Sequence, residues 1–147
     1  MPIRMRVVTR ALAAAILTVV SACSADEDPL VVPTYENIVG AYALYLVNGA
    51  SIPFLAAADG VQRVEIVSGS ITMNADRTIS DVLTFRVSRV DGTGTPTEIP
   101  ESRTGTFIIE GGFVTASYDG EAEPTRITVT NAQLTRSVSS YVLSYRK

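Results

Sequence analysis

The stretch Phe107-Ile-Ile-Glu-Gly-Gly-Phe-Val-Thr-Ala-Ser-Tyr118 decides the fold class of this chain. Phe107 and Ile109 point to one side of an extended segment, and the residues from Phe113 to Tyr118 return in the opposite direction. Gly111 and Gly112 form a two-residue turn between them, because hairpin turns need positive φ angles that glycine adopts freely. The stretch therefore predicts an antiparallel β-hairpin.

Alternating segments of this kind continue on both sides of the hairpin. No run of ten or more residues has a helical period, and the best helical candidate is a single turn at 54–59, closed by Gly60. The longest loop is expected from Asp91 towards Arg103. The other predicted strands lie at 39–47, 61–67, 69–74, 79–90, 126–131, 133–136 and around 141–145. The segments 61–67 and 69–74 are expected to form a hairpin or one long bent strand.

About eight short strands, each apolar on one face, have to bury that face. We expect an all-β domain, a small antiparallel up-and-down barrel, because closure hides one face and removes the exposed edges. An open β-sandwich is the alternative solution.

Four motifs give the chain a resemblance to a known class of domain. They are Ile38-Val39-Gly40-Ala41-Tyr42, Val47-Asn48-Gly49-Ala50-Ser51-Ile52-Pro53, Met73-Asn74-Ala75-Asp76-Arg77-Thr78 and Thr104-Gly105-Thr106-Phe107. In this arrangement the chain resembles small lipocalin-like bacterial lipoprotein domains over most of residues 38–147. It departs from their pattern at Arg77, where glycine is usual, and at Ile52, where leucine is usual. The resemblance implies a fold and says little about activity.

The N-terminus has the features of an export signal. Arginines at 4, 6 and 10 accompany an apolar stretch from Val7 to Val20, which is too short to span a bilayer. Val20-Ser21-Ala22-Cys23 resembles the lipobox of bacterial lipoproteins, in which the cysteine receives a diacylglycerol and becomes the new N-terminus. We therefore expect a signal peptide at 1–22 and lipidation of Cys23, the only cysteine. An ordinary secretory signal cut after Ala22 is the alternative.

The polar, acidic segment 23–37 is predicted to be the acylated N-terminus and a tether, followed by the β domain at 38–147. These features place the protein in the bacterial cell envelope, on the periplasmic or surface side of the membrane. Ser24, rather than aspartate, follows the cysteine, which favours the outer membrane if the host has one.

Charge excludes one class of partner. The chain has 12 basic and 15 acidic residues, and loss of the three signal arginines leaves a net charge of −6. An acidic surface without a lysine and arginine cluster argues against nucleic acid and against electrostatic membrane binding. The membrane contact is therefore expected to be the lipid anchor.

The residue types leave little room for catalysis. The chain has no histidine, and its one lysine is the last residue, Lys147. This removes the commonest general base, the commonest ligands of transition metals, and lysine chemistry away from the terminus. We expect no cofactor and no metal site. Two weaker hypotheses remain: a carboxylate-dependent hydrolase, with a catalytic pair drawn from Glu65, Asp81 and Glu110, and a calcium loop. The calcium loop would comprise Asp119, Glu121 and Glu123, for which a solvated acidic turn is the simpler interpretation.

Aromatic side chains are the candidates for contact with a ligand. An eight-stranded barrel can hold one small apolar molecule, and the candidate lining residues are Tyr42, Phe85, Phe107, Tyr141 and Tyr145. The alternative is that these rings fill the interior. The function expected from the sequence is a membrane-anchored, non-enzymatic binding or interaction module. Its partner would be a small apolar ligand or an envelope protein, and a structural or envelope-assembly lipoprotein is the alternative.

Overall fold

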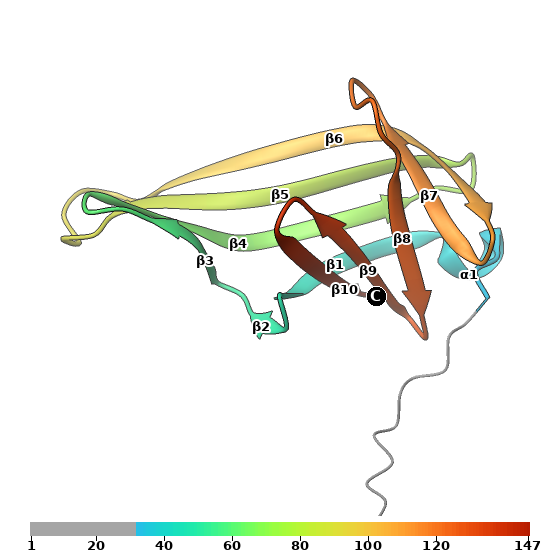
Figure 1. Cartoon of the computed structure of the whole chain (residues 1–147), viewed down its shortest axis with the longest axis horizontal. Coiled ribbons are helices and arrows are strands. Elements are labelled where there is room, and N and C mark those ends of the chain that lie inside the picture. The colour runs from blue at the N-terminus through green and yellow to red at the C-terminus, as the bar shows by residue number, and fades with distance from the viewer. Residues whose placement is uncertain (1–31) are drawn as a thin grey trace, which may run out of the picture.

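The computed structural model describes residues 32–147. The predicted signal, the lipobox and Cys23 lie outside the described residues. The described chain is almost entirely β-structure, arranged as one ten-stranded antiparallel sheet (Figure 1). Its elements are α1 (Tyr35–Ile38), β1 (Gly40–Val47), β2 (Ala50–Ser51), β3 (Phe54–Ala58), β4 (Gln62–Met73), β5 (Thr78–Arg89), β6 (Thr97–Glu110), β7 (Phe113–Tyr118), β8 (Thr125–Thr130), β9 (Gln133–Val138) and β10 (Tyr141–Arg146).

Eight of these strands close into a barrel, which confirms the predicted all-β barrel rather than the open sandwich. The sheet runs from β1 through β10, β9, β8, β7, β6 and β5 to β4. β1 then completes the circle by pairing with β4, so that Ala43 is opposite both Arg146 of β10 and Ser70 of β4. β2 and β3 are the two additional strands.

The hairpins form where the sequence predicts them. Gly111 and Gly112 have φ angles of 58° and 81°, and Asn48 and Gly49 have 51° and 79°, as two-residue hairpin turns require. Arg77 also has a positive φ, 69°, a backbone conformation that glycine adopts more freely than other residues. β6 and β7 approach so closely at Gly105 that a β-carbon there would overlap the backbone of Ser117.

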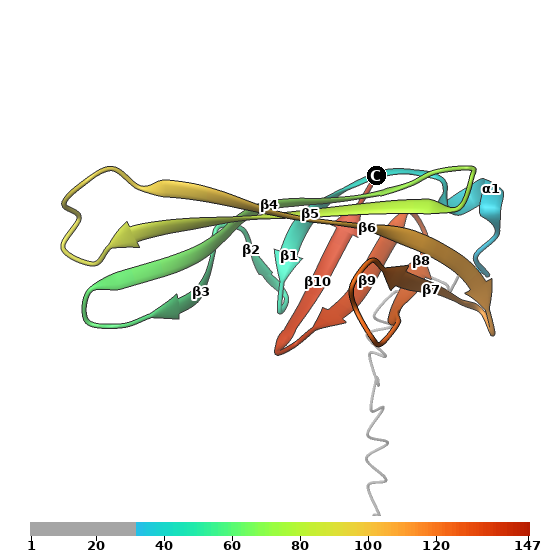
Figure 2. The same ribbon diagram turned by 90° about the horizontal axis from the view of Figure 1, so that it is seen from above.

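Three long strands extend beyond the barrel. β4, β5 and β6 have 12, 12 and 14 residues, whereas β7 to β10 have six each. Their surplus length forms, with β3, a projecting four-stranded sheet that we call the arm, residues 54–66 and 84–101 (Figures 1 and 2). A β-bulge between Ile66 and Ser68 marks the point where β4 leaves the barrel, because a bulge bends the strand that contains it.

The arm corrects two predictions. Residues 54–58 form strand β3 and not a helical turn, because they pair with β4, and an isolated alanine-rich turn gains too little to compete. The loop predicted from Asp91 towards Arg103 ends at Pro96, because residues 97–103 pair with residues 81–87 of β5. Residues 61–67 and 69–74, predicted as a hairpin or as one long bent strand, form the single bent strand β4.

The end of the barrel opposite the arm is closed by α1. Thr34 and Asn37 form a capping box that starts this short helix, and Ile38 is fully buried. The Tyr42 hydroxyl donates to the Ile38 carbonyl at 2.9 Å, and the Lys147 ammonium donates to the Asn37 carbonyl and lies over the Tyr42 ring. Helix α1 thus includes the last three residues of the segment 23–37 predicted as a tether.

Candidate ligand cup and its buried ion cluster

The barrel opens at the end that carries the arm. A cavity of about 360 Å³ lies there between the arm, the hairpin that joins β9 to β10, and the loop that joins β7 to β8. We call this cavity the cup. Its lining residues are Ile66, Asp81, Leu83, Phe85, Glu101, Arg103, Glu121, Val138, Ser139, Tyr141 and Leu143.

One wall of the cup is apolar and continues onto the arm. Ile66, Phe85 and Ile99 are direct cross-strand neighbours on β4, β5 and β6, so their side chains share one face. Phe54 of β3 joins this face opposite Ile66. Ile66 is buried, whereas Ile99 is 46% exposed, so the apolar surface leads from the barrel interior out towards the solvent.

The arm is joined to the barrel rim by Tyr141 of β10. The Tyr141 hydroxyl donates to the Ala56 carbonyl of β3 at 3.0 Å, and its ring meets the Phe54 ring edge-on at 6.0 Å between centroids. β3 and β10 do not pair with each other, so this contact joins the arm directly to the β9–β10 hairpin beside the cup.

The other wall contains a buried ion cluster. Asp81 of β5 is 1% exposed, and its Oδ2 accepts from Nη2 of Arg103 at 2.5 Å and lies 2.6 Å from Nη2 of Arg136. Arg136 is on β9, so the second pair spans the barrel interior. Arg103 is the cross-strand neighbour of Asp81 and also bonds Oε1 of Glu121, at 2.6 Å, on the β7–β8 loop.

Two tyrosines flank the cluster. The Tyr145 hydroxyl accepts from Nε and Nη2 of Arg136 at 3.3 and 3.1 Å, and the Arg103 guanidinium lies 4.5 Å from the centre of the Tyr118 ring. Burial raises the pKa of both phenols to about 12, so both stay protonated at neutral pH. Burial lowers the pKa of Arg103, but its bonds to Glu121 and Asp81 raise it by more, so the net effect is a raised pKa.

The cluster leaves three buried polar atoms without a hydrogen-bond partner in the described residues. They are Oδ1 of Asp81, the Tyr118 hydroxyl and Nη1 of Arg136. Buried polar atoms in proteins are nearly always hydrogen-bonded, so these three atoms mark a place where a further polar group could bind. Asp81 lines the cup, and Arg136 lines a more open groove of about 630 Å³ beside it, between the start of β8 and the end of β9.

The structure places the five predicted lining residues in two different environments. Phe85 and Tyr141 line the cup. Tyr42, Phe107 and Tyr145 are at most 2% exposed and belong to the barrel core. Cys23, the predicted lipidation site, lies outside the described residues.

The candidate carboxylates do not form an opposed pair. Of Glu65, Asp81 and Glu110, only Asp81 is buried. Glu65 bonds Arg63 at 2.5 Å, and Glu110 is exposed at the end of β6. The predicted calcium ligands diverge, since Asp119 accepts from Thr104 and Glu121 from Arg103. Within residues 32–147, no three metal-ligating side chains come together.

The sequence does contain a signal for the ion cluster. Asp81 occupies the apolar face of β5, between Ile79 and Leu83, and Arg136 is in phase with Leu134 and Val138 on β9. A charged residue at an apolar position of an alternating strand predicts a buried, paired charge. Which charges pair could not be read from the sequence, because the partners are far apart in the chain.

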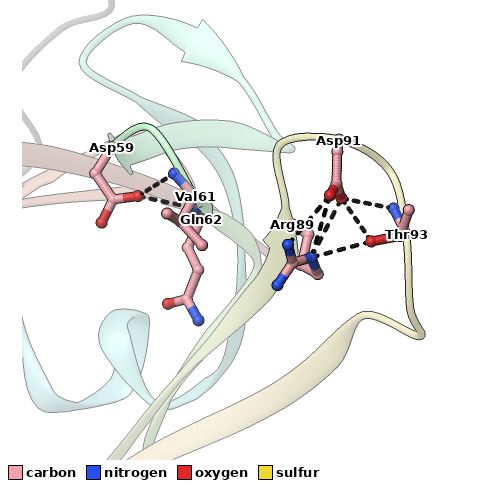
Figure 3. Close-up of polar contacts among 6 residues, drawn as sticks. All are labelled: Asp59, Val61, Gln62, Arg89, Asp91 and Thr93. Carbon is pink, nitrogen blue, oxygen red and sulfur yellow. Dashed lines mark hydrogen bonds and ion pairs between the residues drawn. The ribbon is translucent and has the colours of Figure 1, made fainter.

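The two turns at the arm tip are held by aspartates (Figure 3). Asp59 accepts from the backbone of Val61 and Gln62, both at 2.7 Å. Asp91 bonds the Arg89 guanidinium and both the backbone and the hydroxyl of Thr93. These bonds fix the ends of β4, β5 and β6, and hence the outer part of the apolar wall.

Comparison with models of known families, with curated proteins and with solved structures gives no match. The function of the cup is therefore inferred from its own residues.

Breaking the ion cluster should show that it acts as a unit. Asp81→Leu is expected to cost about 3 kcal/mol or more, because it leaves Arg136 buried without its counter-charge. Adding Arg136→Met should recover part of this loss. In a double-mutant cycle, with the free energy of unfolding measured in urea, the coupling energy should be at least about 1 kcal/mol. The exposed β5–β6 pair Arg86 and Glu98 is the control and should couple far less. Additive losses at 81 and 136 would contradict the pairing.

The arm tip should loosen only in strong acid. Bonds to Arg89 first, and then to Thr93, lower the pKa of Asp91 from 3.8 to about 2. Because the folded-state pKa is the lower one, its contribution to stability is complete above pH 3.8 and is lost as the pH falls through about 2. Carboxyl NMR should give a midpoint for Asp91 near pH 2, and the Thr93 amide shift should follow it. A midpoint near 3.8 would mean that these bonds do not form.

Proposed function

We propose that this protein is a membrane-anchored, non-enzymatic binding module that takes a small, largely apolar ligand into the cup. The observation that carries the proposal is the cavity of about 360 Å³ whose apolar wall extends along the arm. Ligand sites in proteins are typically concave and mainly apolar, with a few polar groups that orient the ligand. The cup has both kinds of wall.

The two ends of the barrel suit such a role. The described chain begins at Val32, beside α1, at the closed end (Figure 1). If Cys23 carries the lipid, the anchor is attached on the side of the closed end, and the cup lies at the other end of the barrel. The proposed lipidation, the signal peptide and the envelope location rest on the sequence motif alone. No helix among residues 32–147 is long and apolar enough to cross a bilayer.

One feature favours the second candidate, an envelope-assembly role. The arm carries four exposed apolar side chains, Leu55, Val61, Val90 and Ile99, and its strands β3 and β6 have outer edges open to another strand. Exposed edges and apolar side chains can join another protein. Pro100, Glu98 and Glu101 on the β6 edge oppose this, since proline and charge are typical protections of an edge.

Filling the cup should weaken ligand binding. Nile red is a suitable probe because it is neutral, apolar and fluorescent in apolar surroundings. Val138→Trp puts a large ring into the cup wall and should weaken Nile red binding at least about tenfold, equivalent to the loss of one well-buried apolar contact. Fluorescence titration of purified protein measures this effect.

Val142→Trp is the matched control. Val142 lies on the same hairpin but is 43% exposed, and it is not among the residues that line the cup. This variant should bind Nile red as the unmodified protein does, and urea unfolding should show that both variants are folded. Equal binding by the two tryptophan variants would exclude the cup as the binding site.

The anchor is tested separately. Mass spectrometry of the membrane fraction should find an N-terminal peptide that begins at Cys23 and carries diacylglycerol. In a Cys23→Ala variant the acylated peptide should disappear and the protein should no longer be retained as a lipoprotein. A wild-type N-terminus with an unmodified thiol would show that the proposed anchor is wrong.

A further inference from the structure

The polar wall of the cup is acidic on balance. Asp81, Glu101 and Glu121 contribute three carboxylates to the lining, and Arg103 contributes the one guanidinium. Arg136 compensates part of this charge through its contact with Asp81, but it lines the neighbouring groove and not the cup. Even with Arg136 included, the groups around the cup carry a net charge of −1.

The guanidinium in the cup wall is already engaged. Arg103 bonds Asp81 through Nη2 and Glu121 through Nη1, and its plane lies over Tyr118. An anionic ligand head would have to displace one of these carboxylates and then remain close to all three. The cup therefore disfavours a carboxylate or phosphate head.

Two carboxylates in the lining have hydrogen-bonding capacity that the described residues do not use. Asp81 is 1% exposed and its Oδ1 has no hydrogen-bond partner in the described residues. Glu101 faces Leu83 across the strands and forms no ion pair within residues 32–147. An ammonium group donates hydrogen bonds and accepts none, so it matches two carboxylate acceptors.

The apolar wall also favours a cation. Phe85 and Tyr141 line the cup beside the carboxylates, and the faces of aromatic rings attract cations. We propose that the ligand class of the cup is an amphipathic organic cation, an apolar chain that ends in a protonated amine. The amine would bond Asp81 and Glu101 and the chain would lie on Ile66, Phe85 and Leu143. This inference rests on the proposed function, since it names the ligand of the same cup.

Three probes of equal chain length distinguish the effect of the head charge from that of apolar burial. They are decylammonium, decanoate and decanol. Each is used to displace Nile red from the purified protein. Decylammonium should displace the dye at a concentration about tenfold lower than decanoate, which corresponds to a modest difference of charge interaction in a partly desolvated site. Decanol should lie between them. Equal or stronger displacement by decanoate or decanol would overturn the proposal.

Substitution of Glu101 tests the named contact. Glu101→Gln should raise the decylammonium concentration needed for half-displacement about threefold, as expected for a partly exposed ion pair, and should leave decanol unchanged. Glu110→Gln on the same strand, outside the cup, is the control and should change neither. No effect of Glu101→Gln on decylammonium would contradict the assignment.

The two proposals fail in different ways. If Nile red binds equally to the Val138→Trp and Val142→Trp variants, the cup is not a ligand site and both proposals are wrong. If Val138→Trp blocks the dye but decanoate is preferred to decylammonium, the cup is a ligand site and only the cation assignment is wrong.

Discussion

The pairing of β1 with both β4 and β10 is the constraint on which the structure depends. Ala43 lies opposite Ser70 on one side and Arg146 on the other, so one residue of one strand joins the two ends of the sheet. Closure removes two edges and buries one face of eight strands. Because β1 pairs with the C-terminal part of β4 only, the N-terminal part of β4 is left to pair with β3 outside the barrel. The arm is thus a consequence of how the barrel closes.

The interior changes character along the barrel. At the α1 end it is filled by apolar and aromatic side chains, among them Ile38, Tyr42 and Phe107, which are at most 2% exposed. Towards the arm, the Asp81 and Arg136 pair spans the interior, and beyond it the cup begins. A buried ion pair contributes little net stability compared with apolar packing, so its position at this boundary is better explained by the polar wall that it provides. The ion pair therefore forms one side of the boundary, whereas Ile66, Leu83 and Leu143 continue the apolar core into the lining of the cup.

Local features of the fold could be predicted from the sequence. The hairpins at Asn48-Gly49 and Gly111-Gly112 follow from turn chemistry that needs no tertiary information. The β1–β4 closure could not be predicted residue by residue, because pairings between distant segments depend on the whole sheet. Residues 97–103 are polar and contain Pro100, so they resemble a loop, and only the length of β5 makes them a strand. Asp81 and Arg136 were each detectable as a charge at an apolar position of a strand, but their pairing with each other and with Arg103 was not.

Buried side chains pack the barrel interior at the α1 end, and the proposed site for an apolar guest is the cup at the arm end. A crystal of the protein pressurised with xenon tests this most directly, because xenon enters apolar cavities and is visible by its scattering. The structure predicts a xenon peak in the cup, against Phe85, Leu83 and Leu143. A cup without xenon, or a peak between α1 and Phe107 instead, would contradict the account.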